Sequence, residues 1–182
     1  TGIRDWLEKL NSSIKPTVIP YGVEVREVSQ KNKLANPTLG YLGKLNKNKG
    51  IEDLIDVYTK FQEKENSSNF ELTLLIGGTG SENYIKSLKN KIKDNNVKFL
   101  GYVEDRYSFF ESIEIFVFPS YSEGLGLVLL EAMAHGVICI TRDVTPMNSI
   151  VDNEENGFLF KDNKELLEKL SLIHISEPTR QE

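Results

Sequence analysis

The sequence predicts an α/β fold, a Rossmann-like doubly wound parallel sheet. Apolar runs of strand length alternate with helical patterns through most of the 182 residues. The runs are almost continuously apolar, which is typical of strands that helices cover on both faces. The net charge of −5, from 22 basic and 27 acidic residues, argues against a general nucleic-acid binder.

The pattern changes near residue 36. Before that point, "IRDWLEKL" (3–10) has helical spacing, "PTVIPYGVEV" (16–25) indicates a strand leading into a turn, and "SQKNKLANP" (29–37) is polar like a linker. After it, strands and helices alternate. The expected strands are 38–43, 71–78, 96–101, 113–119, 136–143 and 157–160, and the expected helices are 51–64, 82–93, 105–112, 124–135 and 163–170.

Ligands of doubly wound sheets bind beyond the carboxyl ends of the strands. The loops that follow the expected strands therefore form the candidate site. These loops are 43–50, 77–81, 101–105, 119–125 and 143–149.

The loop "GKLNKNKG" (43–50) joins a strand to a helix and encloses three lysines between two glycines. A bound diphosphate needs cations within reach and backbone that can approach closely. Lys44 and Lys49 supply the cations, and the glycines allow the approach. A solvated basic loop explains the same residues and is the commoner meaning of such a cluster.

The loop "GGTGSEN" (77–83) resembles a dinucleotide fingerprint only in part. Gly78 and Gly80 have the required spacing, but Asn83 stands where the third glycine belongs. We therefore expect a tight turn between a strand and a helix, and such a turn can still border a ligand.

The stretch "PSYSEGLGLVLLEAMAHG" (119–136) places carboxylates at Glu123 and Glu131 around an apolar helix that opens with Gly124 and Gly126. The glycines allow a sharp bend where the helix begins, and its free N–H groups would form an anion site. A carboxylate within a buried helix is costly unless it is paired or solvated, and a ribose diol is a suitable partner for Glu131. The alternative is that Glu131 lies on the one solvated face of the helix.

Cys139, the single cysteine, excludes a disulfide framework and a cysteine-rich metal site. It lies in the apolar run "GVICI", so we expect a small buried hydrophobic residue. His135 ends the expected helix just before Gly136, and we expect it to pack or to cap that helix. No apolar run approaches the length of a membrane span.

Four segments in order resemble the carboxyl-terminal domain of retaining GT-B glycosyltransferases of family 4 (glycosyl transferases group 1). "VIPYGVEV" resembles the exit from the family's amino-terminal domain, and "GKLNKNKG" resembles its phosphate loop. "FLGYVED" resembles the loop before its fourth strand, and residues 119–136 match its Glu-x7-Glu motif. The resemblance covers residues 16–170.

The resemblance implies a transferase, of hexosyltransferase type, that moves a sugar from a nucleotide-diphosphate sugar to a glycan or glycolipid acceptor with retention of configuration. It implies catalytic roles for Glu123, Lys44 and Lys49. The donor-binding residues that it implies are Glu131, Gly124, Leu125, Gly126, Leu127 and Gly78. It implies no metal or other cofactor, because the lysines and the helix dipole would neutralise the diphosphate.

Residues 1–36 are then expected to be a remnant of the amino-terminal domain with the interdomain linker, and residues 37–169 the sugar-nucleotide domain. Without the amino-terminal domain we expect the chain to be inactive. The implied location is cytoplasmic, with peripheral association at the inner face of the membrane as an alternative for the full-length enzyme. Alternative functions are a GT-B sugar-nucleotide epimerase or phosphorylase, and a non-catalytic sugar-nucleotide-binding subunit.

The sequence departs from the family pattern at several points. Lys44 replaces the usual Arg, Glu114 replaces a usual Asp, and Ile138 replaces a usual Pro. The loop "TPMNS" (145–149) has Ser149 where the family often has Glu, so its contact with the donor stays open.

The last segment, "LSLIHISEPTRQE" (170–182), breaks the helical period of "NKELLEKL" and contains Pro178. Its first eleven residues equal the translation of a transposase-type sequencing adapter. We therefore expect residues 170–182 to be a non-native tail, with 176–182 exposed and poorly ordered.

Overall fold

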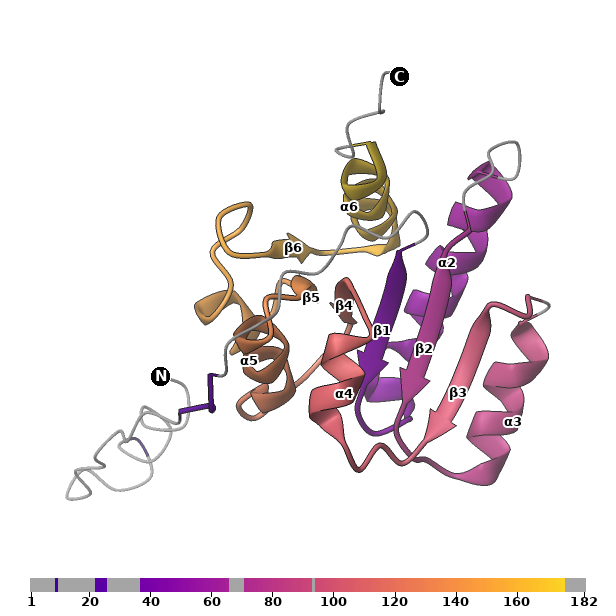
Figure 1. Ribbon diagram of the computed structural model, residues 1–182, viewed down its shortest axis with the longest axis horizontal. Coiled ribbons are helices and arrows are strands. Elements are labelled where there is room, and N and C mark those ends of the chain that lie inside the picture. The colour runs from indigo at the N-terminus through magenta and orange to yellow at the C-terminus, as the bar shows by residue number, and fades with distance from the viewer. Residues whose placement is uncertain (1–8, 10–21, 26–36, 66–70, 93, 176–182) are drawn as a thin grey trace.

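The fold is a parallel six-stranded sheet between two layers of helices, within the residues that the computed structural model describes: 9, 22–25, 37–65, 71–92 and 94–175 (Figure 1). The strands are β1 (Thr38–Leu42), β2 (Thr73–Gly77), β3 (Val97–Gly101), β4 (Ile115–Phe118), β5 (Ile138–Arg142) and β6 (Phe158–Phe160). Each pairs in parallel with its neighbours in the order β3-β2-β1-β4-β5-β6. The predicted Rossmann-like α/β class is confirmed.

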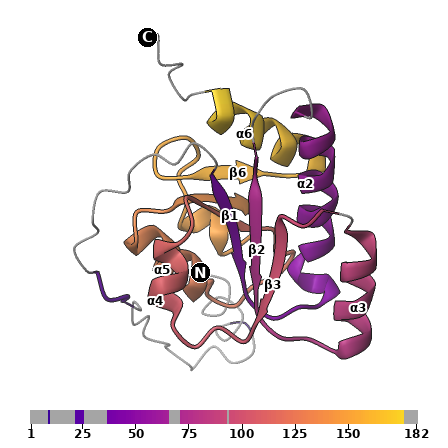
Figure 2. The same cartoon turned by 45° about the vertical axis from the view of Figure 1, so that its right-hand side comes forward.

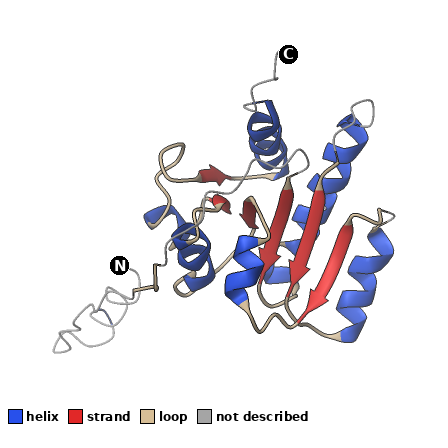
Figure 3. Cartoon of the chain, in the orientation of Figure 1, coloured by secondary structure: helices blue, strands red, loops and turns tan. Residues whose placement is uncertain are grey.

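The first four of the described helices connect successive strands, and the last follows β6; Figure 3 colours helices and strands differently. They are α2 (Ile51–Glu65), α3 (Glu82–Lys91), α4 (Arg106–Glu111), α5 (Leu127–Ala134) and α6 (Asn163–Ile175). Two short 3-10 turns, η1 (Lys47–Lys49) and η2 (Met147–Ser149), lie in loops that follow β1 and β5.

Two hydrophobic cores cover the two faces of the sheet because alternate strand residues point to opposite sides. One core joins Leu39, Tyr41 and Ile76 to residues of α2, α3 and α6, and Figure 2 shows α2 and α3 side by side on that face. The other joins Phe116 and Phe118 to residues of α4 and α5. Burial on both faces explains why the strands are almost continuously apolar.

The strand order reverses direction between β1 and β4, which are hydrogen-bonded neighbours. Connections from β1 leave toward one edge of the sheet and those from β4 toward the other, so their loops separate at the carboxyl ends. Crevices of this kind are where doubly wound sheets bind ligands. The fold therefore places the loops that follow β1 and β4 at one site.

Three element predictions need correction. Helix α5 begins at Leu127 rather than at 124, because Gly126 has a left-handed backbone with φ of 70° and cannot lie within a helix. Only Leu129 and Ala132 of α5 are fully buried, so the helix has one inward face rather than being buried all round. Helix α6 does not end at residue 170 but continues to Ile175, with Leu170 buried and Leu172 half exposed.

Several predicted features lie outside the described residues. They are the helix expected at 3–10 apart from Lys9, the first part of the strand and turn at 16–25, most of the linker at 29–37, and the end of the tail at 176–182.

Candidate functional site

A cavity of about 670 Å³ lies at the carboxyl ends of the strands, at the crossover between β1 and β4. It draws residues from four of the five predicted loops and from the start of α5. The lining residues are Leu42, Gly43, Lys44, Lys49, Gly78, Thr79, Tyr102, Val103, Arg106, Phe118, Glu123, Leu125, Gly126, Leu127 and Val128. Three cations and one carboxylate therefore face a single cavity.

Lys49 and Glu123 form an ion pair across this cavity, with Nζ 2.6 Å from Oε1. Lys49 ends η1 after β1, whereas Glu123 lies in the loop after β4, 74 residues further along the chain. The side chains are 22% and 14% exposed, so the pair is only partly shielded from water. Two of the three predicted catalytic residues therefore meet, and each is partly neutralised by the other.

Lys44 also faces the cavity, but its side chain makes no ion pair with any residue in the described part of the chain. Its carbonyl accepts a hydrogen bond of 3.0 Å from the hydroxyl of Tyr41, whose ring is buried in the core. Burial, and then the nearby charge of Glu123, raises the pKa of Tyr41. The buried tyrosine thus fixes the backbone under Lys44 and leaves the ammonium group available to an anion.

Gly78 brings the loop after β2 against the loop after β1. A Cβ atom at Gly78 would lie 1.7 Å from the carbonyl oxygen of Gly43, so only glycine permits this approach. The Gly78 amide donates to the carbonyl of Gly101 at 2.6 Å. The predicted tight turn is present, and Gly78 borders the cavity with its amide already engaged.

The start of α5 forms one wall of the cavity. Gly126 is the N-cap and has no side chain to cap the helix, and Leu127 and Val128 of the first turn line the cavity. The positive end of a helix dipole at this place attracts anions. Leu125 also lines the cavity, whereas Gly124 is exposed and is not among the lining residues of the described chain.

Glu131 lies in a neighbouring cavity of about 270 Å³ rather than in the larger one. Its two carboxylate oxygens accept hydrogen bonds from Nη1 of Arg106 at 3.0 and 3.1 Å. Arg106, at the start of α4, lines both cavities and so connects Glu131 to the lysines. The free-energy cost expected for a carboxylate within this helix is reduced in two ways. Glu131 is paired with Arg106, and its side chain is 27% exposed to solvent.

No sequence pattern indicates a site role for Arg106, Tyr102 or Val103 individually. The last two lie in the loop 101–105, which was a candidate by its position after a strand. Arg106 begins the next helix, and no local pattern identifies it as the partner of a carboxylate 25 residues away.

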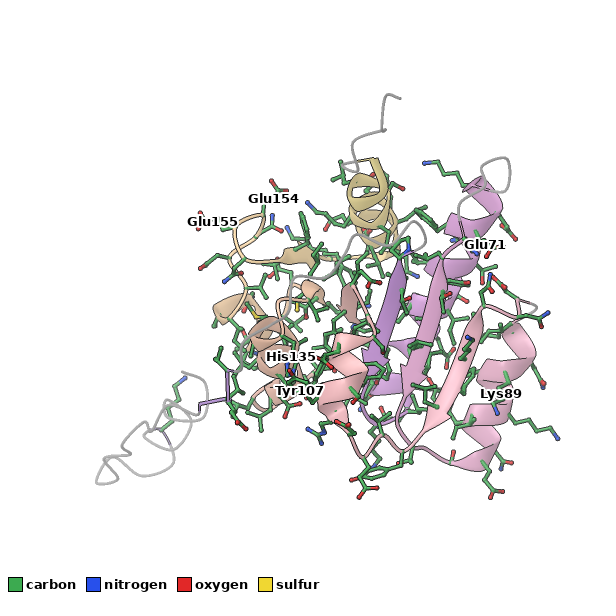
Figure 4. All side chains as sticks on the ribbon, viewed as in Figure 1. Glu71, Lys89, Tyr107, His135, Glu154 and Glu155 are labelled. Atoms are coloured by element: carbon green, nitrogen blue, oxygen red, sulfur yellow. The ribbon has the colours of Figure 1, made fainter. Side chains whose placement is uncertain are left out.

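His135 caps and packs, as predicted. Its Nδ1 donates to the carbonyl of Glu131 at 2.7 Å, and its ring lies 4.8 Å from Tyr107 and 5.2 Å from Phe110 between centroids. Figure 4 shows Tyr107 and His135 next to each other between α4 and α5. The ring therefore joins the two helices that carry Arg106 and Glu131.

Other residues that the sequence singles out can be placed directly. Glu114 is structural, because its Oε2 accepts from the amide of Thr38 at 2.8 Å. Cys139 is fully buried, and burial raises its pKa to about 12. Residues 145–149 are absent from the lining of the larger cavity, within the described chain, although Met147 packs near Gly126.

Within the described residues, no group of three or more His, Cys, Asp or Glu side chains is arranged to hold a metal ion. None of the described helices combines the length and apolar character that crossing a bilayer requires.

The family model of the glycosyl transferases group 1 matches residues 24–182. CapM of Staphylococcus aureus, a capsular polysaccharide biosynthesis glycosyltransferase, is 35% identical over 150 residues. That match covers 80% of this chain and 39% of CapM. The chain therefore belongs to the glycosyl transferases group 1 family, and it spans about two fifths of the length of curated relatives such as CapM.

Solved structures show the same fold. HepE of Anabaena, solved in complex with UDP and glucose, gives a TM-score of 0.70 at 24% identity, covering 79% of this chain and 40% of HepE. The carboxyl-terminal domain of LpcC, a group 1 family protein of Francisella tularensis, gives 0.69 at 24% identity. It covers 77% of this chain and 76% of that domain.

Proposed function

We propose that the chain is the donor-binding part of a retaining glycosyltransferase of family 4 with the GT-B fold. It would bind a nucleotide-diphosphate sugar and transfer a hexose to a glycan or glycolipid. The observation that carries the proposal is the cavity at the strand crossover, which brings Lys44, Lys49, Glu123 and the start of α5 together. Family membership, and HepE's complex with UDP and glucose, support a nucleotide-sugar donor.

The chemistry of the donor explains this set of groups. Breaking the bond between sugar and phosphate leaves negative charge on the departing diphosphate and positive character on the sugar. Lys44, Lys49 and the amino terminus of α5 stabilise the diphosphate. Glu123 holds the sugar at its reacting end, and the fixed cations take the place of a metal ion.

Glu131 would accept hydrogen bonds from the ribose hydroxyls, and Arg106 holds its carboxylate in position until the nucleotide binds. Leu125, Gly126 and Leu127 line the path of the donor, whereas Gly78 shapes the opposite wall. Gly124 acts by allowing the loop to bend before the helix.

The acceptor would bind against a second, amino-terminal domain, which the full-length protein would supply across the cleft from the donor. The match to the carboxyl-terminal domain of LpcC, most of which this chain covers, supports that division. We place the full-length enzyme in the cytoplasm, with its acceptor at the inner face of the membrane when that acceptor is a glycolipid.

The test is transfer from UDP-, GDP- and ADP-sugars by the protein extended upstream through its complete reading frame, in parallel with residues 1–182. We expect transfer by the long protein only, unaffected by EDTA, with the donor's anomeric configuration retained in the product by ¹H NMR. Lys49→Met should abolish transfer, and Lys86→Met, an exposed lysine on α3, is the matched control.

The outcomes separate the alternatives. Release of an epimerised sugar or of a sugar phosphate would indicate an epimerase or a phosphorylase. Nucleotide binding without any turnover by the long protein would indicate a non-catalytic subunit. Transfer by residues 1–182 alone would contradict the two-domain arrangement.

A further inference from the structure

A polar cluster lies behind the cavity, between β5, α2 and the loop after β4. Its centre is the guanidinium group of Arg142, whose side chain is only 7% exposed. Nη2 of Arg142 lies 2.5 Å from Oδ2 of Asp53, Nε donates to the carbonyl of Pro119 at 3.0 Å, and Nη1 donates to the carbonyl of Lys161 at 3.1 Å. All three nitrogen atoms of the guanidinium group therefore have a partner.

The same cluster holds Tyr121. Its hydroxyl donates to Oδ2 of Asp53 at 2.5 Å, and its ring centroid lies 4.0 Å from Cζ of Arg142. The hydrogen bond to Asp53, followed by burial, raises the pKa of Tyr121. The Tyr121 side chain is therefore held by two contacts. Arg142 lies over its ring, and Asp53 accepts from its hydroxyl as well as from Arg142.

The cluster reaches the Lys49–Glu123 pair through the backbone. The amide of Tyr121 donates to the carbonyl of Asn48 at 2.9 Å, and Asn48 directly precedes Lys49. Glu123 follows Tyr121 by two residues. The loop that carries the carboxylate is thus tied to the turn that carries the lysine, at a point adjacent to both charged residues.

Close packing supports the same connection. Gly50, at the end of η1, has φ of 64°, and a Cβ atom there would lie 2.1 Å from the carbonyl oxygen of Pro119. Only glycine allows this approach. That carbonyl is the one to which Arg142 donates, so the arginine and the glycine together fix the start of the loop.

None of Asp53, Tyr121 and Arg142 lines the cavity of the described chain, so their role cannot be contact with a ligand there. We propose that these three residues are positioning residues that hold Lys49 and Glu123 in their paired geometry. The nucleotide part of this inference rests on the proposed function, whereas the geometry of the pair can be tested without any nucleotide.

The test uses Tyr121→Phe and Arg142→Lys in the 182-residue chain. Tyr121→Phe removes only the hydroxyl and keeps the ring under Arg142, whereas Arg142→Lys keeps the charge and loses the fork of donors. The matched control is Tyr58→Phe. Its hydroxyl also hydrogen-bonds to an aspartate, Asp94 at 2.8 Å, but its partners Leu72, Asp94 and Gln62 lie outside η1 and the loop after β4.

The first measurement is the ¹³C resonance of the Glu123 carboxylate, assigned by its loss in Glu123→Gln. Removal of its partner in Lys49→Met gives the shift of an unpaired Glu123. We expect Tyr121→Phe and Arg142→Lys to move the resonance toward that value. Tyr58→Phe should lower the thermal midpoint and leave the resonance in place, because it destabilises the fold without touching the loop.

The second measurement is UDP affinity by calorimetry, with GDP and ADP as further probes. We expect Tyr121→Phe to weaken binding by about three- to tenfold. In the Lys49→Met background the same change should have no further effect, because positioning residues act through Lys49. A purely structural role would give equal losses in both backgrounds.

A Glu123 resonance and UDP affinity that are unchanged in both folded variants would overturn the inference. If Arg142→Lys does not fold, Tyr121→Phe decides alone. If the wild-type chain binds none of the three nucleotides, the proposed function fails, and the Glu123 resonance still decides whether the cluster positions the pair.

Discussion

Two ion pairs border the candidate site, and they differ in how firmly the protein holds them. Lys49 and Glu123 are 22% and 14% exposed, and their two loops are joined by backbone hydrogen bonds and by the Arg142 cluster. Arg106 and Glu131 are 55% and 27% exposed, and Arg106 begins a helix of only six residues. Both pairs have good geometry, so distance alone does not distinguish them.

The difference indicates two ways to prepare a carboxylate for a ligand. The Lys49–Glu123 pair is part of a fixed surface, so a diphosphate would meet charges already in place. The Arg106–Glu131 pair is solvated on one side, so a ribose could replace the arginine at small cost. Losing a buried charge beneath the first pair should therefore cost stability as well as binding, whereas losing a charge at the second pair should cost binding alone.

The largest expected effect is on stability, and it comes from removing Asp53, whose carboxylate pairs with Arg142 beneath the Lys49–Glu123 pair. Asp53→Ala leaves the guanidinium of Arg142 buried without its charge partner, which we expect to lower the free energy of unfolding by about 3–5 kcal/mol. Urea unfolding measures this change. Asp56→Ala on the same helix is the control, because Asp56 is exposed and lies 3.9 Å from Lys91. Equal losses in the two variants would contradict the idea of a buried cluster.

The second-largest effect is expected on nucleotide affinity when the Arg106–Glu131 pair loses its carboxylate. Glu131→Ala should weaken nucleoside diphosphate binding by about 1.5–3 kcal/mol, the cost of losing hydrogen bonds to a charged group. Calorimetry with UDP, GDP and ADP measures it. Glu155→Ala, in the outward-facing loop labelled in Figure 4, is the control and should bind as the wild type does. Unchanged affinity in a folded Glu131→Ala protein would reject the ribose assignment.

The sequence predicts the fold more completely than the site. Apolar runs and helical periods locate the described strands and helices to within three residues, except at the end of α6, because burial on both faces of a sheet leaves a local pattern. The start of α5 was placed three residues too early. Apolar periodicity did not reveal that Gly126 would be left-handed.

The loops of the site follow from strand position alone, but the pairing within them does not. Glu123 meets Lys49 across 74 residues, and Glu131 meets Arg106 across 25. Which cation reaches which carboxylate depends on the strand order and on how loops pack, and neither is a local property. The Arg142 cluster was missed for the same reason, since Arg142 and Asp53 are 89 residues apart.

The third prediction tests the two lysines near the Lys49–Glu123 pair as ligands of a diphosphate. If Lys44 and Lys49 face the diphosphate, UDP should bind much better than uridine, and the preference should shrink as salt is raised. Lys44→Arg should bind UDP as well as the wild type or better by up to about 1 kcal/mol, because Arg can contact two phosphate oxygens. Calorimetry at low and high salt measures both. Uridine binding as tightly as UDP would contradict a diphosphate site.

The smallest effect is expected for stability at the second pair. Arg106→Ala removes a cation that is more than half exposed, so water and salt already screen its attraction to Glu131. Glu131 keeps access to solvent, and we expect the free energy of unfolding to change by about 0–1 kcal/mol. Urea unfolding at low and high salt measures the change. Lys91→Ala is the matched control, because Lys91 pairs with Glu52 at 3.1 Å with both side chains similarly exposed. A loss well above that of Lys91→Ala, persisting at high salt, would show that Arg106 and Glu131 are as firmly held as the first pair and would remove the contrast between them.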